Sequence, residues 1–261
     1  MTERKKEDAE MTKPVILGLV AGAILVGLSG VAKEISIPQE ALLGGNVVIA
    51  ESGSFYEKGR DGELVPREFQ AWPGDHGWRS ADWFDVRIEA DRGDVLVLAP
   101  GTYTSDVWIF VAGITVTTQP NAAAAAEIWG TVEIDADAVT LDRIAVIGAK
   151  KGNSSGHGIE INRERINRIT VRNCRVEGNE WMGIHVIGPR GEITELRVEN
   201  CRVVNNGSFG IEAQAVRSLV ITGCTVTGNS QGVHIGSHVD AVEMHDNVIT
   251  GNRYANVYRK E

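Results

Sequence analysis

Basic residues are fewer than acidic residues in this chain of 261 residues. Lysine and arginine together number 26, against 35 aspartates and glutamates, so the formal net charge at pH 7 is −9. A nucleic-acid backbone is bound through a surplus of lysine and arginine that neutralises its phosphates. The charge balance therefore argues against nucleic acid as a partner.

Cysteine is also rare, with only Cys174, Cys201 and Cys224 in the whole chain. Three thiols cannot all pair within one chain, and no Cys-x-x-Cys or cysteine–histidine spacing of the zinc-binding kind occurs. The sequence predicts no metal site and no cofactor. Glycine, in contrast, is abundant at 30 residues, which indicates a chain that turns often, because tight corners favour a residue that tolerates a positive φ angle.

One long uncharged run lies near the N-terminus, at residues 14–32, and reads PVILGLVAGAILVGLSGVA. As a helix it would span roughly 28 Å, about the thickness of a bilayer core. Basic residues precede the run, whereas Lys33 is the only one for more than twenty positions after it. This bias predicts a cytoplasmic tail at residues 1–13, a single transmembrane helix at residues 14–32 and a main domain in the periplasm or outside the cell.

Two kinds of segment fit this run. A cleaved signal peptide has the same layout, with Gly30-Val31-Ala32 as an acceptable cleavage site. A retained anchor has the fuller length, and Gly18-x-x-x-Gly22 would suit packing on another membrane helix, although glycine is common in membrane segments in any case. We favour the anchor, and either segment exports the domain.

Four stretches in the second half of the chain repeat one pattern. They read ITVRNCRVEGN (169–179), LRVENCRVVNN (196–206), LVITGCTVTGN (219–229) and VEMHDNVITGN (242–252). Apolar and mostly polar residues alternate at the start of each stretch, which predicts a strand. A second predicted strand accompanies each repeat: GIEI (158–161), GIHV (183–186), GIEA (210–213) and GVHI (232–235).

Equivalent positions of the repeat form columns of like residues. One asparagine column is expected to hydrogen-bond from coil to coil as a ladder. Its members are Asn179, Asn206, Asn229 and Asn252. The three cysteines share another column, and we expect free, buried thiols there, because parallel Cβ vectors make the torsion of a disulfide poor. A third column, formed by Asn173, Asn200, Gly223 and Asp246, suits a left-handed backbone at a corner.

A repeat of 22–30 residues with two or three short strands is one coil of a solenoid, whose apolar face is buried only by stacking. Residues 93–103, GDVLVLAPGTY, and 112–116, AGITV, resemble the opening coils of the pectate-lyase-like superfamily of right-handed parallel β-helices. The Gly-Ile-x-Ile and Asn-Cys-x-Val repeats resemble the same superfamily. Its members include polysaccharide lyases, hydrolases, epimerases, periplasmic accessory proteins and adhesins, so the resemblance implies a fold without choosing an activity.

The fold expected is therefore all-β, a right-handed parallel β-helix of about six coils over residues 93–258. Residues 33–92 are expected to form a linker and an N-terminal cap. Aromatic residues crowd residues 51–85 without strand periodicity. The end of a solenoid has to be covered, so we interpret this segment as the cap, with a docking surface for sugar or a partner protein as the alternative.

One row of polar residues is the best candidate for chemistry. The second strands place one polar residue per coil on the outer face, namely Glu160, His185, Glu212 and His234. Glutamate beside histidine suits general acid–base work, and these four would be the catalytic residues of an enzyme. A flat column does not converge on one point as metal ligands do. The interpretation we prefer is a solvated sheet face on which opposite charges stack across strands.

Other enzyme signatures are partial or missing. Gly156-His157-Gly158 resembles a segment of polygalacturonases, but the Asn-x-Asp, Asp-Asp and Arg-x-Lys elements of that family have no counterpart at matching places. We therefore interpret His157 as a corner residue. The resemblance to pectate lyases would imply a calcium site of clustered aspartates, and no aspartate column occurs.

Arginines gather near Glu199 in two consecutive repeats: Arg172, Arg175, Arg197 and Arg202. They would form either a surface for an anionic polysaccharide or, as we prefer, an ordinary salt-bridged face.

The leading functional hypothesis is a membrane-anchored, extracytoplasmic structural or interaction protein, such as an accessory subunit of a membrane protein complex. The anchor at residues 14–32 and the missing enzyme signatures favour it. Its expected partners are the membrane and other membrane-protein subunits. The alternatives are an extracytoplasmic polysaccharide lyase, hydrolase or epimerase, and a non-catalytic carbohydrate-binding module, both with polysaccharide as the partner.

Overall fold

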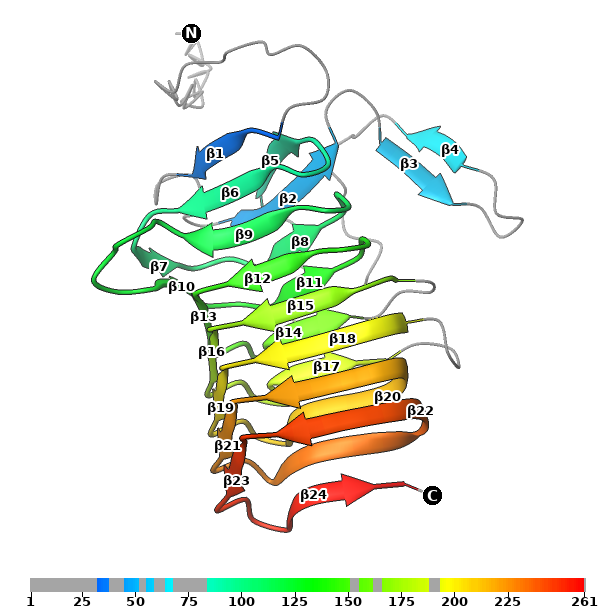
Figure 1. The fold of residues 1–261 in the computed structure, drawn as a ribbon. Helices are drawn as coiled ribbons and strands as arrows, with labels where there is room; N and C mark the ends of the chain where they lie inside the picture. The colour runs from blue at the N-terminus through cyan, green and yellow to red at the C-terminus, as the bar shows by residue number, and fades with distance from the viewer. Residues whose placement is uncertain are drawn as a thin grey trace, which may run out of the picture.

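The computed structural model is wound almost entirely from short parallel strands into a solenoid (Figure 1). It describes residues 32–37, 45–51, 55–58, 64–67, 84–150, 155–161, 166–187 and 193–260. The prediction of an all-β parallel β-helix is confirmed. Residues 1–31, which hold almost the whole of the predicted anchor, lie outside the described residues. Within the described ranges, none of the structure is a helix with the length and apolar character needed to span a bilayer.

Each coil contributes one strand to each of three faces. The first face contains β6 (Val95–Leu98), β9 (Thr115–Thr118), β12 (Thr140–Asp142), β15 (Ile169–Arg172), β18 (Ile193–Glu199) and the second halves of β20 (Phe209–Thr222) and β22 (Gln231–His245). The second face contains β8 (Val107–Ile109), β11 (Val132–Ile134), β14 (Ile159–Ile161), β17 (Ile184–Val186), the first halves of β20 and β22, and β24 (Ala255–Arg259). The third face contains β7 (Gly101–Tyr103), β10 (Ala126–Ile128), β13 (Ile144–Ile147), β16 (Arg175–Glu177), β19 (Arg202–Val204), β21 (Thr225–Thr227) and β23 (Val248–Thr250).

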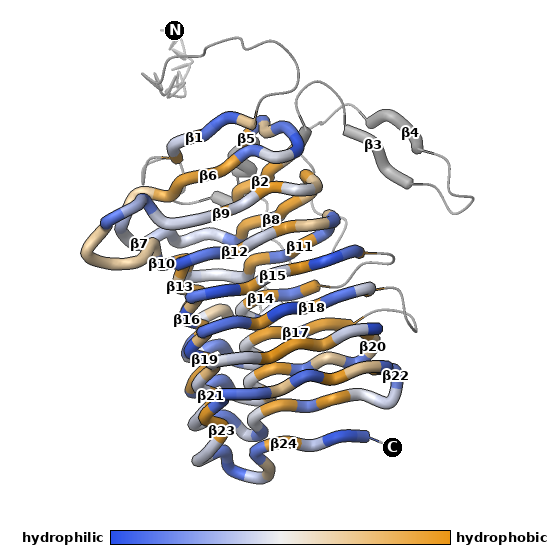
Figure 2. Tube along the Cα trace, viewed as in Figure 1, coloured by the Kyte–Doolittle hydropathy of each residue, from blue (hydrophilic) through white to orange (hydrophobic). Residues whose placement is uncertain are grey.

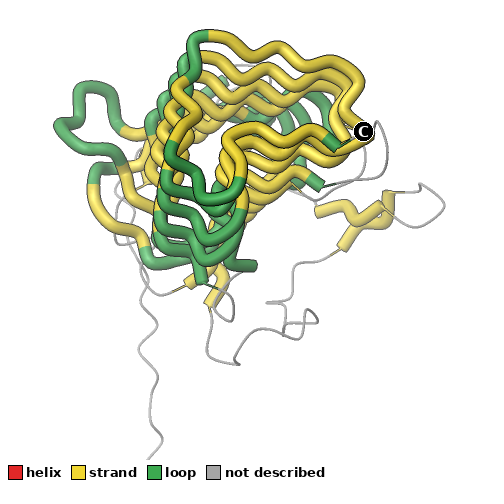
Figure 3. The backbone as a smooth tube through the Cα atoms, turned by 90° about the horizontal axis from the view of Figure 1, so that it is seen from below, coloured by secondary structure: helices red, strands yellow, loops and turns green. Residues whose placement is uncertain are grey.

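The third face is a separate seven-stranded sheet, so the described residues form seven coils with a strand on all three faces, one more than the six that the repeats indicate. The first two faces join into one 15-stranded sheet because β20 and β22 run through the corner between them. The β20–β22 register shifts at that corner, between Ala213 and Ala215. Figure 3, which looks along the stack, shows the strands and turns of successive coils lying over one another.

The solenoid begins earlier than residue 93. In the part predicted as linker and cap, β1 (Glu34–Ile37) pairs with β6, β2 (Gly45–Glu51) pairs with β8, and β5 (Phe84–Ala90) pairs with β2. A short antiparallel hairpin, β3 (Phe55–Lys58) with β4 (Leu64–Arg67), lies between them in sequence. These strands escape a search for repeats because they carry neither the asparagine nor the cysteine column that marks the later coils.

Stacked aliphatic columns fill the interior. Ile169, Leu196 and Leu219 occupy equivalent positions of successive strands, and none of them is exposed to solvent. Figure 2 shows the alternation of hydrophobic and hydrophilic residues along the strands that places these columns inside. Each coil therefore covers the apolar face of its neighbour, as a solenoid requires.

The asparagine ladder is confirmed. The side-chain amides of Asn179, Asn206 and Asn229 each donate to the Oδ1 of the next asparagine at 2.9–3.0 Å. That same oxygen also accepts the backbone N–H of the preceding asparagine, as between Asn206 N and Asn229 Oδ1 at 2.9 Å. Because all three asparagines are buried, the ladder satisfies turn amides that have no access to water.

The predictions for the other two columns are confirmed as well. Cys174, Cys201 and Cys224 are free and buried, and their thiols donate to backbone carbonyl oxygens of the preceding coil and of their own. The corner column has left-handed φ angles, for example 54° at Asn173 and 58° at Asp246. These columns fix the register of the coils and hence the alignment of the outer faces.

Candidate functional site

The four polar residues predicted to form one row lie in register on the second face. Glu160 of β14 pairs with His185 of β17, His185 pairs with Glu212 of β20, and Glu212 pairs with His234 of β22. Their neighbours along each strand, such as Ile159 and Ile161 beside Glu160, are fully buried in the core. The row therefore projects outward, one residue per coil, as the repeat indicates.

The row is not a solvated face, and on this point the interpretation we preferred from the sequence is wrong. Glu160 is 9% exposed, His185 8% and Glu212 only 2%. A buried carboxylate is costly unless a partner compensates for its lost hydration. The contacts within the row therefore decide whether it is a stable arrangement.

Glu212 lies at the centre of these contacts. Its Oε1 is 2.9 Å from Nδ1 of His234 and accepts a hydrogen bond of 3.0 Å from Nε2 of Gln214. Its Oε2 is 3.5 Å from Nε2 of His185 but makes no hydrogen bond within the described structure. On the other side of His185, Nδ1 is 3.8 Å from Oε1 of Glu160, which is too long for a hydrogen bond.

A fifth side chain, His157, joins this row from the turn before β14. It is 9% exposed, and its ring centroid is 4.2 Å from that of His185 and 6.0 Å from that of Trp181. From the sequence we interpreted His157 only as a corner residue. Its position in the repeat is the signal that could have indicated its place beside the row. His157 and Phe209 each directly precede the glycine of a second strand, and each packs beside the row residue of the next coil: Phe209 stacks on His234 at 4.7 Å.

The ionisable groups around His157 differ in charge. Burial, together with the nearby His185 imidazole, lowers the pKa of His157 to about 4, so its imidazole is neutral at pH 7. For Glu160, burial acts to raise the pKa, but the neighbouring groups of His185, Ser155 and His157 outweigh it and the net pKa is lowered. The site therefore combines a neutral imidazole with an anionic carboxylate. Nδ1 of both His157 and His185 is buried and makes no hydrogen bond within the described structure.

Aromatic side chains flank the row on its solvent side. Tyr258 follows His234 in the same register, with ring centroids 5.2 Å apart, and is 47% exposed. Trp181, beside His157, is 40% exposed. Exposed aromatic faces beside polar groups suit the apolar faces of sugar rings as well as protein side chains.

The arginines predicted to gather near Glu199 are divided between two faces. Arg172 and Arg197 lie on the first face, whereas Arg175 and Arg202 lie on the third. Arg197 is within 3.1 Å of both Glu195 and Glu199. Arg172 lies 3.4 Å from Asp142, and Arg175 contacts Glu127 and Glu177. These pairings agree with a salt-bridged surface rather than a single anion-binding patch.

Comparison with known proteins supports the fold. The family model described as "Right handed beta helix region" matches residues 134–258, which confirms the right-handed parallel β-helix predicted from the repeats. No curated protein matches the sequence. Among solved structures, the chain is similar to the periplasmic alginate epimerase AlgG, with 12% sequence identity, coverage of 88% of this chain and 73% of that chain, and a TM-score of 0.32. We assign no activity from this similarity.

Proposed function

From the premise that the chain is a right-handed parallel β-helix, matched by that family over residues 134–258, we propose that it is an exported, membrane-anchored interaction protein. In this proposal the β-helix is an accessory subunit that receives a partner polypeptide on its C-terminal end. The observation that supports it is the exposure of apolar side chains in the last coil that the structure describes.

Apolar and aromatic side chains are unusually exposed in that coil. Val248 is 55% exposed, Tyr254 68% and Val257 47%. Ile249 is only partly buried, whereas Val226, its equivalent one coil earlier, is not exposed at all. The end of a solenoid needs a covering element to hide its core, and apolar exposure of this kind is typical of a surface that contacts another protein.

The backbone of the same coil is also open. Among the described residues, β23 pairs only with β21, and β24 pairs only with β22. Each therefore presents one edge of unpaired N–H and C=O groups, which is a template for an added strand. A partner that supplies an extended segment with apolar side chains would pair with the edge of β24 and cover Val257.

The position of this end agrees with an anchor at residues 14–32. Glu34, where β1 begins, lies at the opposite end of the solenoid from β24 (Figure 1). Seven coils stacked about 4.8 Å apart separate the two ends by roughly 34 Å. An anchor that leads directly into β1 would place the open end away from the membrane, where an extracytoplasmic partner has access to it.

Site-specific photo-crosslinking of the full-length protein in its native membrane tests this proposal. A photoreactive residue at Val257 should crosslink to a second polypeptide of different mass, and Val257→Asp should abolish co-purification of that polypeptide. The same photoreactive residue at Glu34, which is exposed at the other end, is the matched control and should give no such product. A solitary monomer without a crosslink at Val257, or a crosslink only between copies of this chain, would contradict an accessory role.

The buried row on the second face favours a second candidate function, an extracytoplasmic polysaccharide lyase, hydrolase or epimerase. Glu212 and His234 are 2.9 Å apart, a geometry that suits proton transfer, and Tyr258 offers a ring for a sugar to stack on. Turnover of uronate polymers that falls at least a hundredfold in His185→Ala and His234→Ala would support an enzyme. Polymer binding without turnover would indicate a carbohydrate-binding module instead.

A further inference from the structure

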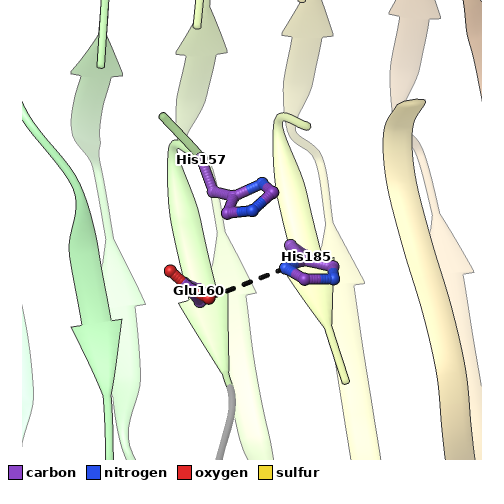
Figure 4. Close-up of side chains that lie close together, drawn as sticks. All are labelled: His157, Glu160 and His185. Atoms are coloured by element: carbon purple, nitrogen blue, oxygen red, sulfur yellow. Dashed lines mark ion pairs between the residues drawn. The ribbon is translucent and has the colours of Figure 1, made fainter. Parts of the chain in front are cut away.

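We propose that His157, Glu160 and His185 bind one divalent transition-metal ion, such as zinc, on the outer surface of the second face (Figure 4). This site is independent of the open C-terminal end and goes beyond the interaction role proposed above. The inference rests on how the three side chains converge and on three buried polar atoms that have no hydrogen bond.

The convergence comes from two directions. Glu160 and His185 lie side by side because they are register partners on neighbouring strands, β14 and β17. Figure 4 shows His157 coming from the preceding turn and lying over the gap between them. Each of the three residues offers a ligand atom, and these atoms all lie within 4.8 Å of one another. Residues on parallel strands alone approach an ion from one side only. His157 approaches it from a second side.

The second observation is a set of buried polar atoms that make no hydrogen bond within the described residues. Nδ1 of His157 and Nδ1 of His185 are buried without a hydrogen bond in the described part of the chain, and both residues are more than nine-tenths buried. A buried polar group without a partner is costly, so such groups in a native protein call for an explanation. A metal ion bound to these nitrogens removes that cost, because the lone pair of a neutral imidazole is the ligand it requires.

The third unpaired atom, Oε2 of Glu212, is explained by the same ion. A metal bound to Nδ1 of His185 leaves the ring proton on Nε2, and Nε2 faces Oε2 of Glu212 at 3.5 Å. Glu212 is itself held by His234 and Gln214. A carboxylate that accepts the second ring N–H of a metal-bound histidine is the usual outer support of such sites. One ion thus accounts for all three atoms.

The donor set selects the class of metal. Two imidazoles and one carboxylate suit zinc and other first-row divalent ions, with a position left for water or a substrate, whereas calcium prefers six to eight oxygen ligands. Bonds of about 2.0–2.2 Å bring ligand atoms to roughly 3.3 Å from one another. We therefore expect His157, which lies on a turn outside the paired strands, to move closer by about 1 Å when the ion binds.

Titration of the chelator-stripped, full-length protein with zinc chloride tests the site. Calorimetry should report one ion per chain, and His157→Ala, His185→Ala and Glu160→Gln should each weaken binding by about a hundredfold or more. Glu212→Gln, which alters the outer support, should weaken it by roughly ten- to a hundredfold. His245→Ala is the matched control, because it removes an exposed imidazole that lies between Glu243 and Asp246 on the first face, and its affinity should stay within a few-fold of the wild type.

Cobalt chloride gives a second readout that does not depend on affinity alone. The ring of Trp181 is 6.0 Å from that of His157, so bound Co²⁺ should quench its fluorescence. Trp181→Phe should lose this quenching and retain binding.

Several results would overturn the site. They are no bound zinc, or a loss of binding in His245→Ala as large as the losses in His157→Ala and His185→Ala. Circular dichroism of each variant separates loss of the site from loss of the fold. Crosslinking at Val257 should be unchanged in all of them, so failure of the metal site and failure of the interaction role remain distinguishable.

Discussion

Oε1 of Glu212 lies 2.9 Å from Nδ1 of His234, and the side chain of this glutamate is only 3% exposed although it projects from the outside of the solenoid. The contact between this carboxyl group and the imidazole is thus formed away from bulk water. Breaking a buried pair by removing one partner is more destabilising than breaking an exposed one, because the remaining group stays desolvated.

Glu212→Ala should therefore lower the free energy of unfolding by about 3 kcal/mol, measured by urea denaturation in the presence of a chelator. The exposed pair of Glu243 and His245, at 3.2 Å, is the matched control, since it has the same chemistry in solvent. Glu243→Ala should cost less than about 0.5 kcal/mol. Equal effects of the two substitutions would show that burial of the row contributes nothing.

The glycine that opens each second strand is required by the asparagine ladder. A Cβ atom added to Gly183 would lie 2.6 Å from the carbonyl oxygen of Gly210 and 2.7 Å from Nδ2 of Asn206. Gly178 provides a contrast, because its φ angle is +67° but an added Cβ would meet nothing within 4 Å.

Gly183→Ala should accordingly destabilise the fold by at least about 2 kcal/mol, because it forces the buried ladder apart. Gly178→Ala should cost only about 1 kcal/mol, which is the penalty for a left-handed backbone without a steric clash. Thermal denaturation of both variants compares them directly. If Gly178→Ala proved the more harmful, backbone conformation and not the ladder would determine the need for glycine in these coils.

Most of the fold could be predicted from the repeats, because each column of like residues reflects one physical requirement of a coil. Asn179 and its equivalents mark a turn whose amides are buried, and Cys174 and its equivalents mark a small buried side chain beside a left-handed corner. Such signals recur every 23–27 residues, so the stacking could be derived without coordinates. The strands β1, β2 and β5 were missed because their coils lack these columns and only their pairing with later strands reveals them.

The candidate site was only partly predictable. The row of Glu160, His185, Glu212 and His234 follows from the period of the repeat, but its burial does not, since outward positions of a sheet are normally solvated. Burial depends on neighbours such as Phe209, which stacks on His234 from a different coil. The contribution of His157 depends on the path of one turn, and the equivalent residues of the next two coils are Met182 and Phe209. These equivalent residues share no chemistry, so a comparison of the repeats does not identify His157 as a residue of the site.

The buried thiols give a prediction about reactivity. Hydrogen bonding among the stacked sulfurs and burial raise the pKa of Cys201 and of Cys224, so neither thiol is a thiolate at neutral pH. A thiol-specific reagent at pH 8 should leave Cys174, Cys201 and Cys224 unmodified in the folded protein and should modify all three in denaturant. Counting the released chromophore checks this. Rapid modification of one thiol in the native state would mean that the coil around it opens easily.

The pH dependence of stability provides the most direct test of the environment of His157. Its pKa is about 4 in the folded protein and near 6.5 in the unfolded chain. Above pH 6.5 the ring is neutral in both states and has no effect, whereas between pH 6.5 and pH 4 the unfolded chain takes up a proton that the folded protein does not. Stability should therefore be lost as the pH falls through this window, by roughly 2 kcal/mol for the metal-free protein.

Comparison of the wild type with His157→Gln isolates this loss, since the variant should show a shallower decline between pH 6.5 and pH 4. His245 is a control whose effect on stability has the opposite pH dependence. Its hydrogen bond with Asp246 raises its pKa. Its stabilising effect is therefore present at low pH and is lost as the pH rises through its pKa in the folded protein. His245→Gln should therefore leave the decline below pH 6.5 no shallower than in the wild type. Urea titrations at half-unit pH intervals give both curves. Identical pH profiles for the wild type and His157→Gln would mean that the ring of His157 is hydrated in solution and that the buried cluster around it does not form.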